Sequence, residues 1–262
     1  MMKAHRRLDS GIEQYIFSLE EHGLSFDINI TTLIDGGEAL LIDAGYPEHG
    51  SVVKKMLDER GIQVKRLVLS HYHPDHAAGM VAFPDANIYC SEDYEINFKN
   101  CSELWDAETA YRKADYLLHT GDQMTFGAFE LTFHKTPGHS VCSLSVIING
   151  AYVHPGDLIM NDQHDQPALP LICKDGDIGE HLKSLEWLLS QSDKIFLLPH
   201  GNTLVSQEAI VHAITIRALY LKSLIEAYEL WHDKNYEALK LEAWSCPQWH
   251  KANMKMAQVR VL

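Results

Sequence analysis

The sequence has no cysteine arrangement that would stabilise a small secreted fold or enclose a metal ion in thiolates. Its 262 residues include five cysteines, an odd number, and no two of them form a C-x-x-C pair. A disulfide framework and an all-cysteine metal site are therefore excluded. We expect buried, free thiols in a reducing compartment. The five residues are Cys90, Cys101, Cys142, Cys173 and Cys246.

Long apolar runs and an excess of basic residues are also missing. No stretch approaches the roughly 20 apolar residues that a membrane-spanning helix requires. The basic residues 1–7 are not followed by the apolar segment of a secretory leader, so we expect a cytoplasmic protein. Lys and Arg number 22 against 36 Asp and Glu, and the formal net charge of −14 repels nucleic acids and anionic membranes. We expect neither as a partner, and a small molecule as the substrate.

The composition that remains, 46% hydrophobic and 22% charged, is typical of a globular protein with a sizeable core. Strand-like runs occur in two groups with helical patterns between them, which favours two sheets over one doubly wound sheet. We predict an α/β (α+β) protein: an αββα sandwich of two mixed β-sheets flanked by helices, with a C-terminal helical extension. Residues 1–205 would form the sandwich and residues 206–262 the extension.

Individual elements follow from apolar periodicity and turn residues. Asp35-Gly36-Gly37 and Asn149-Gly150 predict two β-hairpins. Helices are predicted from Ser51 to Gly61, over residues 92–116 and over residues 178–189. Strands are predicted over residues 27–34, 38–43, 63–69, 88–90, 130–136, 144–148, 151–154 and 194–198.

Beyond residue 205 the pattern becomes helical. Apolar side chains recur every three or four positions, which is typical of one face of a long helix. Two shorter helices are predicted, over residues 236–244 and after Pro247. The apolar face would pack on the sandwich or at a homodimer interface, and a lid over the substrate pocket is a further alternative. The recurring residues are Ile210, Ile214, Ala218, Leu221, Ile225 and Tyr228.

The hexapeptide His71-Tyr72-His73-Pro74-Asp75-His76 contains four metal-binding side chains directly after an apolar strand. One ion cannot accept all four without severe strain, but two neighbouring ions can share them. His71 and His73 would serve one ion, and Asp75 and His76 the other. Imidazole with carboxylate suits zinc, iron or manganese, and a dinuclear site of this kind suits hydrolysis.

Three later segments each place a further possible ligand just after an apolar strand. His139 lies in Thr-Pro-Gly-His-Ser, Asp157 in Pro-Gly-Asp and His200 in Pro-His-Gly. Together they complete two coordination sets. His139 would join His71 and His73, His200 would join Asp75 and His76, and the two oxygens of Asp157 would bridge both ions.

These motifs resemble those of the metallo-β-lactamase superfamily, in its branch of dinuclear hydrolases. The resemblance covers about residues 28–205 and follows the family's motif order, from His-x-His-x-Asp-His to Pro-His-Gly. It implies two divalent cations as cofactors, with zinc expected and iron or manganese as alternatives. It also implies that Asp43, in Leu-Ile-Asp-Ala-Gly, accepts a hydrogen bond behind the ligands and orients them.

Differences between this sequence and the motifs of individual branches of the family reduce the number of possible activities. True β-lactamases generally lack an Asp where Asp157 stands. Hydroxyacylglutathione hydrolases follow that Asp with a Gly-Cys-Gly-Arg-type loop, whereas Leu158-Ile159-Met160 follows it here. Acyl-homoserine lactonases have a tyrosine where this chain has Met160. The motifs therefore indicate a hydrolase and leave its substrate open.

The resemblance implies that water activated at the dinuclear site attacks a small ester, thioester or lactone. Asp75 and Asp157 would orient that water, and Asp75 would carry the proton to the leaving group. Two alternatives stay open on the sequence. One is an iron-dependent oxygenase acting on a thiol or persulfide, and the other is a weakly catalytic, metal-containing regulatory protein.

Overall fold

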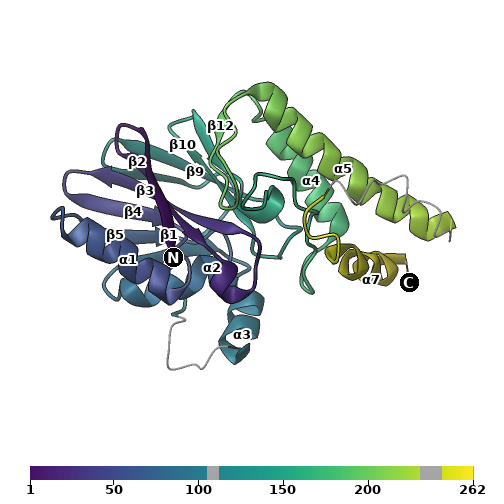
Figure 1. Cartoon of the computed structure of the whole chain (residues 1–262), viewed down its shortest axis with the longest axis horizontal. Helices are drawn as coiled ribbons and strands as arrows, with labels where there is room; N and C mark the ends of the chain where they lie inside the picture. The colour runs from purple at the N-terminus through teal and green to yellow at the C-terminus, as the bar shows by residue number, and fades with distance from the viewer. Residues whose placement is uncertain (105–111, 231–243, 262) are drawn as a thin grey trace.

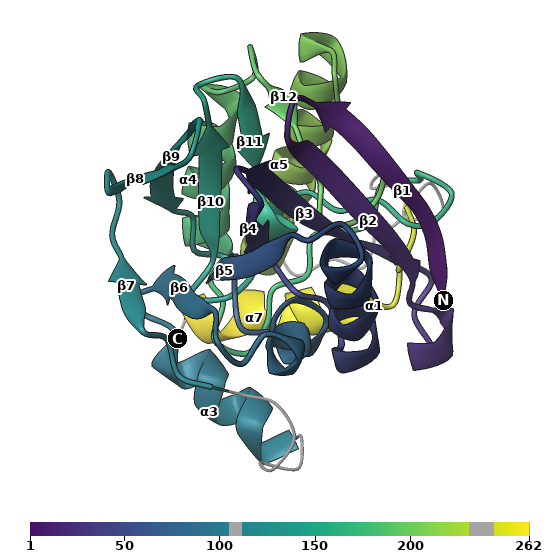
Figure 2. The ribbon, with the colours of Figure 1, turned by 90° about the vertical axis from the view of Figure 1, so that its left-hand side faces the viewer.

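The protein was analysed as a computed structural model that describes residues 1–104, 112–230 and 244–261. Two mixed β-sheets lie face to face and helices cover both outer faces, which confirms the predicted αββα sandwich (Figures 1 and 2). Among the described residues, no helix is long and apolar enough to cross a membrane.

The first sheet has seven strands in chain order, antiparallel from β1 to β4 and parallel from β4 to β7. The second has the order β12-β11-β10-β9-β8, with β12 parallel to β11 and the other pairs antiparallel. The strands are β1 (Met2–Asp9), β2 (Ile12–Ser18), β3 (Asp27–Asp35), β4 (Glu38–Ile42), β5 (Gln63–Val68), β6 (Asn87–Ser91), β7 (Tyr116–Leu118), β8 (Gln123–Phe126), β9 (Phe129–Lys135), β10 (Leu144–Ile148), β11 (Tyr152–His154) and β12 (Ile195–Phe196).

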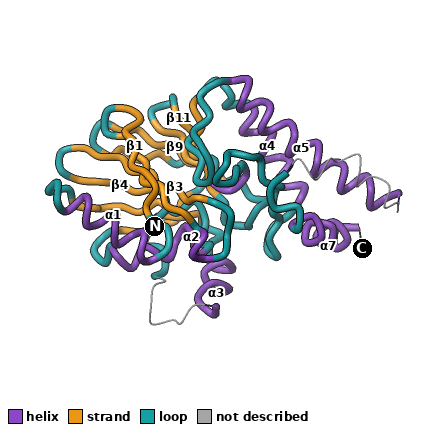
Figure 3. The backbone as a smooth tube through the Cα atoms, viewed as in Figure 1, coloured by secondary structure: helices purple, strands orange, loops and turns teal. Residues whose placement is uncertain are grey.

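Helix α1 covers the outer face of the first sheet, and α4 and α5 cover that of the second (Figure 3). Short 3₁₀ turns interrupt the loops at Glu20–His22, Ala78–Ala82 and Gly156–Leu158. The α-helices are α1 (Pro47–Asp58), α2 (Pro74–Ala77), α3 (Glu95–Leu104), α4 (Ile178–Leu189), α5 (Gln207–Leu230) and α7 (Trp249–Val261).

Alternation along the strands builds the layers. On β4, Leu40 and Ile42 join the apolar cluster between the two sheets, whereas Leu41 joins the cluster beneath α1. Strand side chains point to opposite faces with a period of two, so a strand apolar on both faces must be covered on both. Burial of this kind holds the sheet edge that carries the site at a fixed position.

Two strands at the N-terminus were not predicted. Strand β2 is buried along its whole length although it contains Glu13 and Gln14. Glu13 is paired with Arg60, with Nη1–Oε2 2.7 Å and Nη2–Oε1 2.9 Å, and Gln14 donates a hydrogen bond to Thr31 at 3.2 Å. These tertiary partners allow polar residues inside the sheet, and the sequence pattern alone does not reveal them.

Two of the predicted helices have wrong boundaries. Helix α1 begins at Pro47, where the missing N–H of proline costs nothing, and Ser51 lies within it and donates a hydrogen bond to the Pro47 carbonyl. The helix predicted over residues 92–116 contains only α3 among the described residues, because Tyr116–Leu118 pairs with β6 as a strand. The predicted helix over residues 236–244 lies outside the described residues except for Trp244, and so does the side chain of Tyr228.

The C-terminal segment packs on the sandwich. Helix α5 lies along α4, and α7 contacts α5. The Asn253 side chain accepts a hydrogen bond from the Ile172 amide at 3.0 Å and donates one to the Pro170 carbonyl at 2.6 Å. The ring of Trp249 stacks on Phe26 with centroids 5.4 Å apart. These contacts connect α7 to a loop beside the candidate site. The domain boundary between residues 205 and 206 and the homodimer stay predictions.

Candidate metal centre

All the predicted ligands lie in connections that follow the C-terminal ends of strands, with Asp75 and His76 in the short helix α2 and Asp157 in a 3₁₀ turn. The segment from His71 to His76 follows β5, and Asp43 follows β4. From the second sheet, His139 follows β9, Asp157 follows β11 and His200 follows β12. The face-to-face packing of the sheets brings these five loops to one edge of the sandwich.

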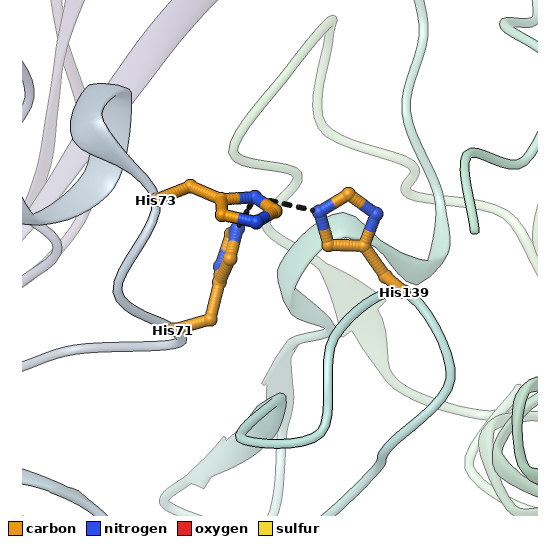
Figure 4. A group of neighbouring side chains, drawn as sticks. All are labelled: His71, His73 and His139. Atoms are coloured by element: carbon orange, nitrogen blue, oxygen red, sulfur yellow. Dashed lines mark hydrogen bonds between the residues drawn. The ribbon is translucent and has the colours of Figure 1, made fainter. Parts of the chain in front are cut away.

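The first group is formed by His71, His73 and His139 (Figure 4). His73 Nδ1 lies 2.9 Å from His71 Nε2 and 3.0 Å from His139 Nε2. Pro74 begins α2 directly after His73, so the backbone turns there. Three nitrogen atoms from residues predicted as ligands therefore lie close together.

The second group is formed by Asp75, His76 and His200. The two Nε2 atoms of the histidines are 3.2 Å apart. Asp75 Oδ2 lies 3.6 Å from His76 Nε2 and 3.5 Å from His200 Nε2. Two nitrogens and a carboxylate oxygen thus converge on a second place.

Asp157 lies between the two groups, with one oxygen facing each. Its Oδ1 is 3.3 Å from His76 Nε2 and 3.4 Å from His200 Nε2. Its Oδ2 is 3.8 Å from His71 Nε2 and 3.6 Å from His139 Nε2. The side chain is buried, and Oδ1 accepts no hydrogen bond. This is the arrangement expected of a carboxylate shared by two cations.

Hydrogen bonds on the far side of the rings fix their orientation. His76 Nδ1 donates to Asp43 Oδ2 at 2.8 Å, and His200 Nδ1 to the Asp27 carbonyl at 2.6 Å. His139 Nδ1 donates to the Leu171 carbonyl at 2.8 Å. With Nδ1 as the donor, the Nε2 atom of each ring faces the site, where a metal ion can take the place of a second proton.

Asp43 organises the loop that carries most of the ligands. Its two oxygens accept hydrogen bonds from the amide and the hydroxyl of Ser70, both at 2.8 Å, as well as the bond from His76. Its backbone is left-handed, with φ 63°, a conformation that Asp and Asn tolerate better than most residues. The residue lies behind His76, on the side of the ring away from the other ligands, and its orienting role stays a prediction.

The pKa shifts of the histidines differ between the two groups of proposed ligands. Burial lowers the pKa of His71 and of His73 well below the ordinary value, so both are neutral and ready to bind a cation. Burial also acts to lower the pKa of His76, but the carboxylates of Asp157, Asp75 and Asp43 outweigh it and raise that pKa. Burial alone would raise the pKa of Asp157. The neighbouring His76 and His200 outweigh burial and hold that pKa well below its ordinary value.

The residues present fit two divalent cations. The first group offers three imidazole nitrogens, and the second offers two imidazole nitrogens and a carboxylate oxygen. Oδ1 of Asp157, which accepts no hydrogen bond, faces the second group. Such nitrogen and oxygen donors suit zinc, iron or manganese better than calcium or magnesium.

A different group of possible ligands, His22, Glu48 and His49, does not fit a cation. His49 Nδ1 accepts a hydrogen bond from the Tyr46 amide at 3.2 Å, so the proton of the neutral ring is on Nε2. That is the atom facing Glu48, 3.7 Å from Oε1, and it has no lone pair to give. His22 Nε2 pairs with the same oxygen at 2.7 Å. Hydrogen bonding among these side chains therefore accounts for the cluster.

Three residues near the site were not predicted as part of it: Ser70, Cys173 and Arg217. Arg217 is completely buried and donates to the Met160 and Ala213 carbonyls and to Asn161 Oδ1. The Asn161 amide in turn donates to the His200 carbonyl at 3.1 Å, so helix α5 supports the loop after Asp157. In the sequence, the signal for this role was an arginine on the otherwise apolar face of the predicted helix.

His154 gives the metal-free protein a dependence on pH. It is buried 3.9 Å from Asp43 Oδ2, and neither ring nitrogen has a hydrogen-bond partner. Burial lowers its pKa from 6.5 to about 4. The unfolded chain therefore binds a proton near pH 6.5 and the folded chain does not. The unfolding free energy of the metal-free protein therefore decreases as the pH falls from 6.5 towards 4.

Replacing His154 with leucine should remove this contribution. We expect the loss of unfolding free energy between pH 6.5 and 4 to be smaller in His154→Leu, by about 1.4 kcal/mol per pH unit. Urea unfolding of both metal-free proteins at pH 7.5 and pH 5 measures the difference. Equal losses in the two proteins would contradict the assignment.

Comparisons with known proteins agree with this architecture. The sequence model of a family described as the metallo-beta-lactamase superfamily matches residues 26–200. A hydroxyacylglutathione hydrolase of Erwinia tasmaniensis is 24% identical over 131 residues, which are 48% of this chain and 45% of that protein. The chain therefore spans about half the length of that relative. A protein of Bacillus subtilis named probable metallo-hydrolase YqgX is 25% identical over 187 residues, 68% of this chain and 83% of that protein.

Solved structures share the fold at low sequence identity. A metallo-beta-lactamase from Pontibacter korlensis superposes with a TM-score of 0.64 and 18% identity, covering 82% of this chain and 98% of its own. DIM-1 metallo-beta-lactamase superposes with a TM-score of 0.61 and 15% sequence identity. The superposition covers 85% of this chain and 99% of that protein. Similarity at this level establishes the arrangement of sheets and helices and leaves the reaction open.

Proposed function

The chain belongs to the metallo-β-lactamase superfamily, and on that premise we propose that it is a metal-dependent hydrolase of a small ester, thioester or lactone. The observation that carries the proposal is the position of Asp157, whose two oxygens each face a different group of ligands. A carboxylate so placed holds two cations side by side, and paired cations serve hydrolysis. The relatives named hydroxyacylglutathione hydrolase, a thioester hydrolase, support this substrate class.

Two bound divalent cations would lower the pKa of a water molecule and polarise the substrate's carbonyl oxygen. His71, His73 and His139 would hold one, and Asp75, His76 and His200 the other, with Asp157 shared. We propose zinc as the metal, with iron or manganese as alternatives.

The chain's own carboxylates would direct the proton. Asp157 is buried and both of its oxygens face ligand nitrogens, so it would position the attacking water and keep its charge. The side chain of Asp75 is 17% exposed, which leaves it access to the substrate. We assign Asp75 the transfer of the proton from water to the leaving group, at its carboxylate oxygens. We also propose a cytoplasmic location, which is supported by the finding that none of the five cysteines forms a disulfide.

Metal analysis and a substrate panel test the proposal together. Protein purified without added metal should contain about two transition-metal ions per chain and hydrolyse at least one class among thioesters, lactones and esters. His76→Ala should lose one ion and the activity. His164→Ala, which alters an exposed loop histidine close to Asp157 in sequence, should keep both. A single iron with oxygen consumption would instead establish an oxygenase, and full metal content in His76→Ala would remove His76 from the ligand set.

A further inference from the structure

Cys173 is the one cysteine of the five that is not buried, and it lies at the metal centre. Its Sγ is 3.9 Å from His139 Nε2, the atom that His139 presents to the first group. Neither the spacing of the cysteines nor the ligand motifs indicate a sulfur at this place. The proposed two-cation mechanism does not use it.

Backbone contacts hold this sulfur and the imidazole as one unit. The Cys173 amide donates to the His139 carbonyl at 3.0 Å, and His139 Nδ1 donates to the Leu171 carbonyl at 2.8 Å. The loop then packs against the turn before His139 so closely that a Cβ on Gly176 would lie 2.3 Å from the Gly138 carbonyl oxygen. These contacts hold the backbone of Cys173 beside that of His139, so that the sulfur can reach the side of the ring that carries Nε2.

The separation is close to that of two ligands on one ion. In a tetrahedral zinc site with Zn–N about 2.0–2.1 Å and Zn–S about 2.3 Å, the nitrogen and sulfur are roughly 3.5 Å apart. The observed 3.9 Å between Sγ and His139 Nε2 exceeds that separation by a few tenths of an ångström. Since Nδ1 carries the His139 proton, the Nε2 lone pair and the sulfur can meet at the same ion.

We propose that Cys173 is a further ligand for the cation held by His71, His73 and His139, an inference that rests on the proposed metal centre. On binding, the S–H bond breaks, the proton passes to solvent, and a sulfur lone pair forms the bond to the metal without any change of oxidation state. A thiolate there competes with the substrate's oxygen for the first cation and favours thiophilic ions such as zinc, cobalt and cadmium over manganese.

Cobalt(II) substitution separates the sulfur from the nitrogen ligands. In the wild-type protein loaded with two equivalents of Co(II), we expect visible d–d absorption together with a near-ultraviolet thiolate-to-cobalt charge-transfer band. Cys173→Ser and Cys173→Ala should lose the charge-transfer band and retain the visible bands. Cys246→Ser, which alters a buried cysteine, is the matched control and should keep both.

Each other outcome has a definite meaning. Visible bands without the charge-transfer band in the wild type, or an unchanged charge-transfer band in Cys173→Ser, would overturn the sulfur ligand and leave the proposed hydrolase intact. Failure of Co(II) to bind, with neither set of bands, would overturn both proposals.

Discussion

Replacing Asp157 with asparagine is expected to reduce the bound metal from about two ions per chain to about one. It is also expected to lower the hydrolytic rate by on the order of 10²–10⁴-fold, the range associated with a positioned acid–base group. Asparagine keeps the size of the side chain but loses the charge that faces both groups of ligands. The effect should be large because the carboxylate is buried, and its Oδ1 lies within 3.4 Å of both His76 Nε2 and His200 Nε2.

The second group should lose its cation first. Asp157 raises the pKa of His76 and of His200, and its Oδ1 is the oxygen nearest their Nε2 atoms. Equilibrium dialysis and steady-state kinetics on the same preparation measure both effects. Asp162→Asn is the control, since Asp162 is also buried in this loop but accepts hydrogen bonds from the amides of His164 and Gln166. Two tightly bound ions in Asp157→Asn would refute the bridging role.

Replacing Asp43 with alanine is expected to cost the metal-free protein about 3–5 kcal/mol of unfolding free energy at pH 6, the range for breaking a buried ion pair. Asp43 is completely buried, and three hydrogen bonds from Ser70 and His76 end on its oxygens. Alanine also fits poorly at φ 63°. Metal affinity should fall by roughly 10–100-fold as well, because His76 loses the partner that orients it.

Asp43→Asn separates charge from backbone conformation. Asparagine tolerates the left-handed backbone, so this variant should be less destabilised than Asp43→Ala. Because the pKa of His76 is raised in the fold, its contribution to stability is present below pH 6.5 and is lost as the pH rises through the folded value. Removing the Asp43 charge should weaken this dependence. Urea unfolding between pH 6 and 9 measures it, and an unchanged pH profile in Asp43→Asn would contradict the ion pair.

The proposed ligands could be singled out from the sequence because their segments follow apolar runs and each is of a metal-binding residue type. The strand before His71 and the turn residues around His139 and His200 need no tertiary information to be recognised. Asp43 is less distinctive, since an aspartate at a strand end commonly caps a turn, and only the family resemblance assigned it a role.

Features that depend on distant partners could not be predicted. Strand β2 contains Glu13, whose burial is explained only by Arg60, 47 positions away. Cys173 approaches His139 from 34 residues further along the chain. Arg217, on helix α5, supports the loop after Asp157 by donating a hydrogen bond to Asn161, 56 positions earlier in the chain. In each case the sequence presents an ordinary polar residue, and the fold supplies the contact that gives it a role.

The anomalous scattering of crystals grown from the metal-loaded protein would test the two-cation site most directly. We predict two peaks, one bonded to His71, His73 and His139 and one to Asp75, His76 and His200, with a different oxygen of Asp157 bonded to each. A single peak, or two peaks of which Asp157 contacts only one, would contradict the shared carboxylate on which the proposed hydrolase depends.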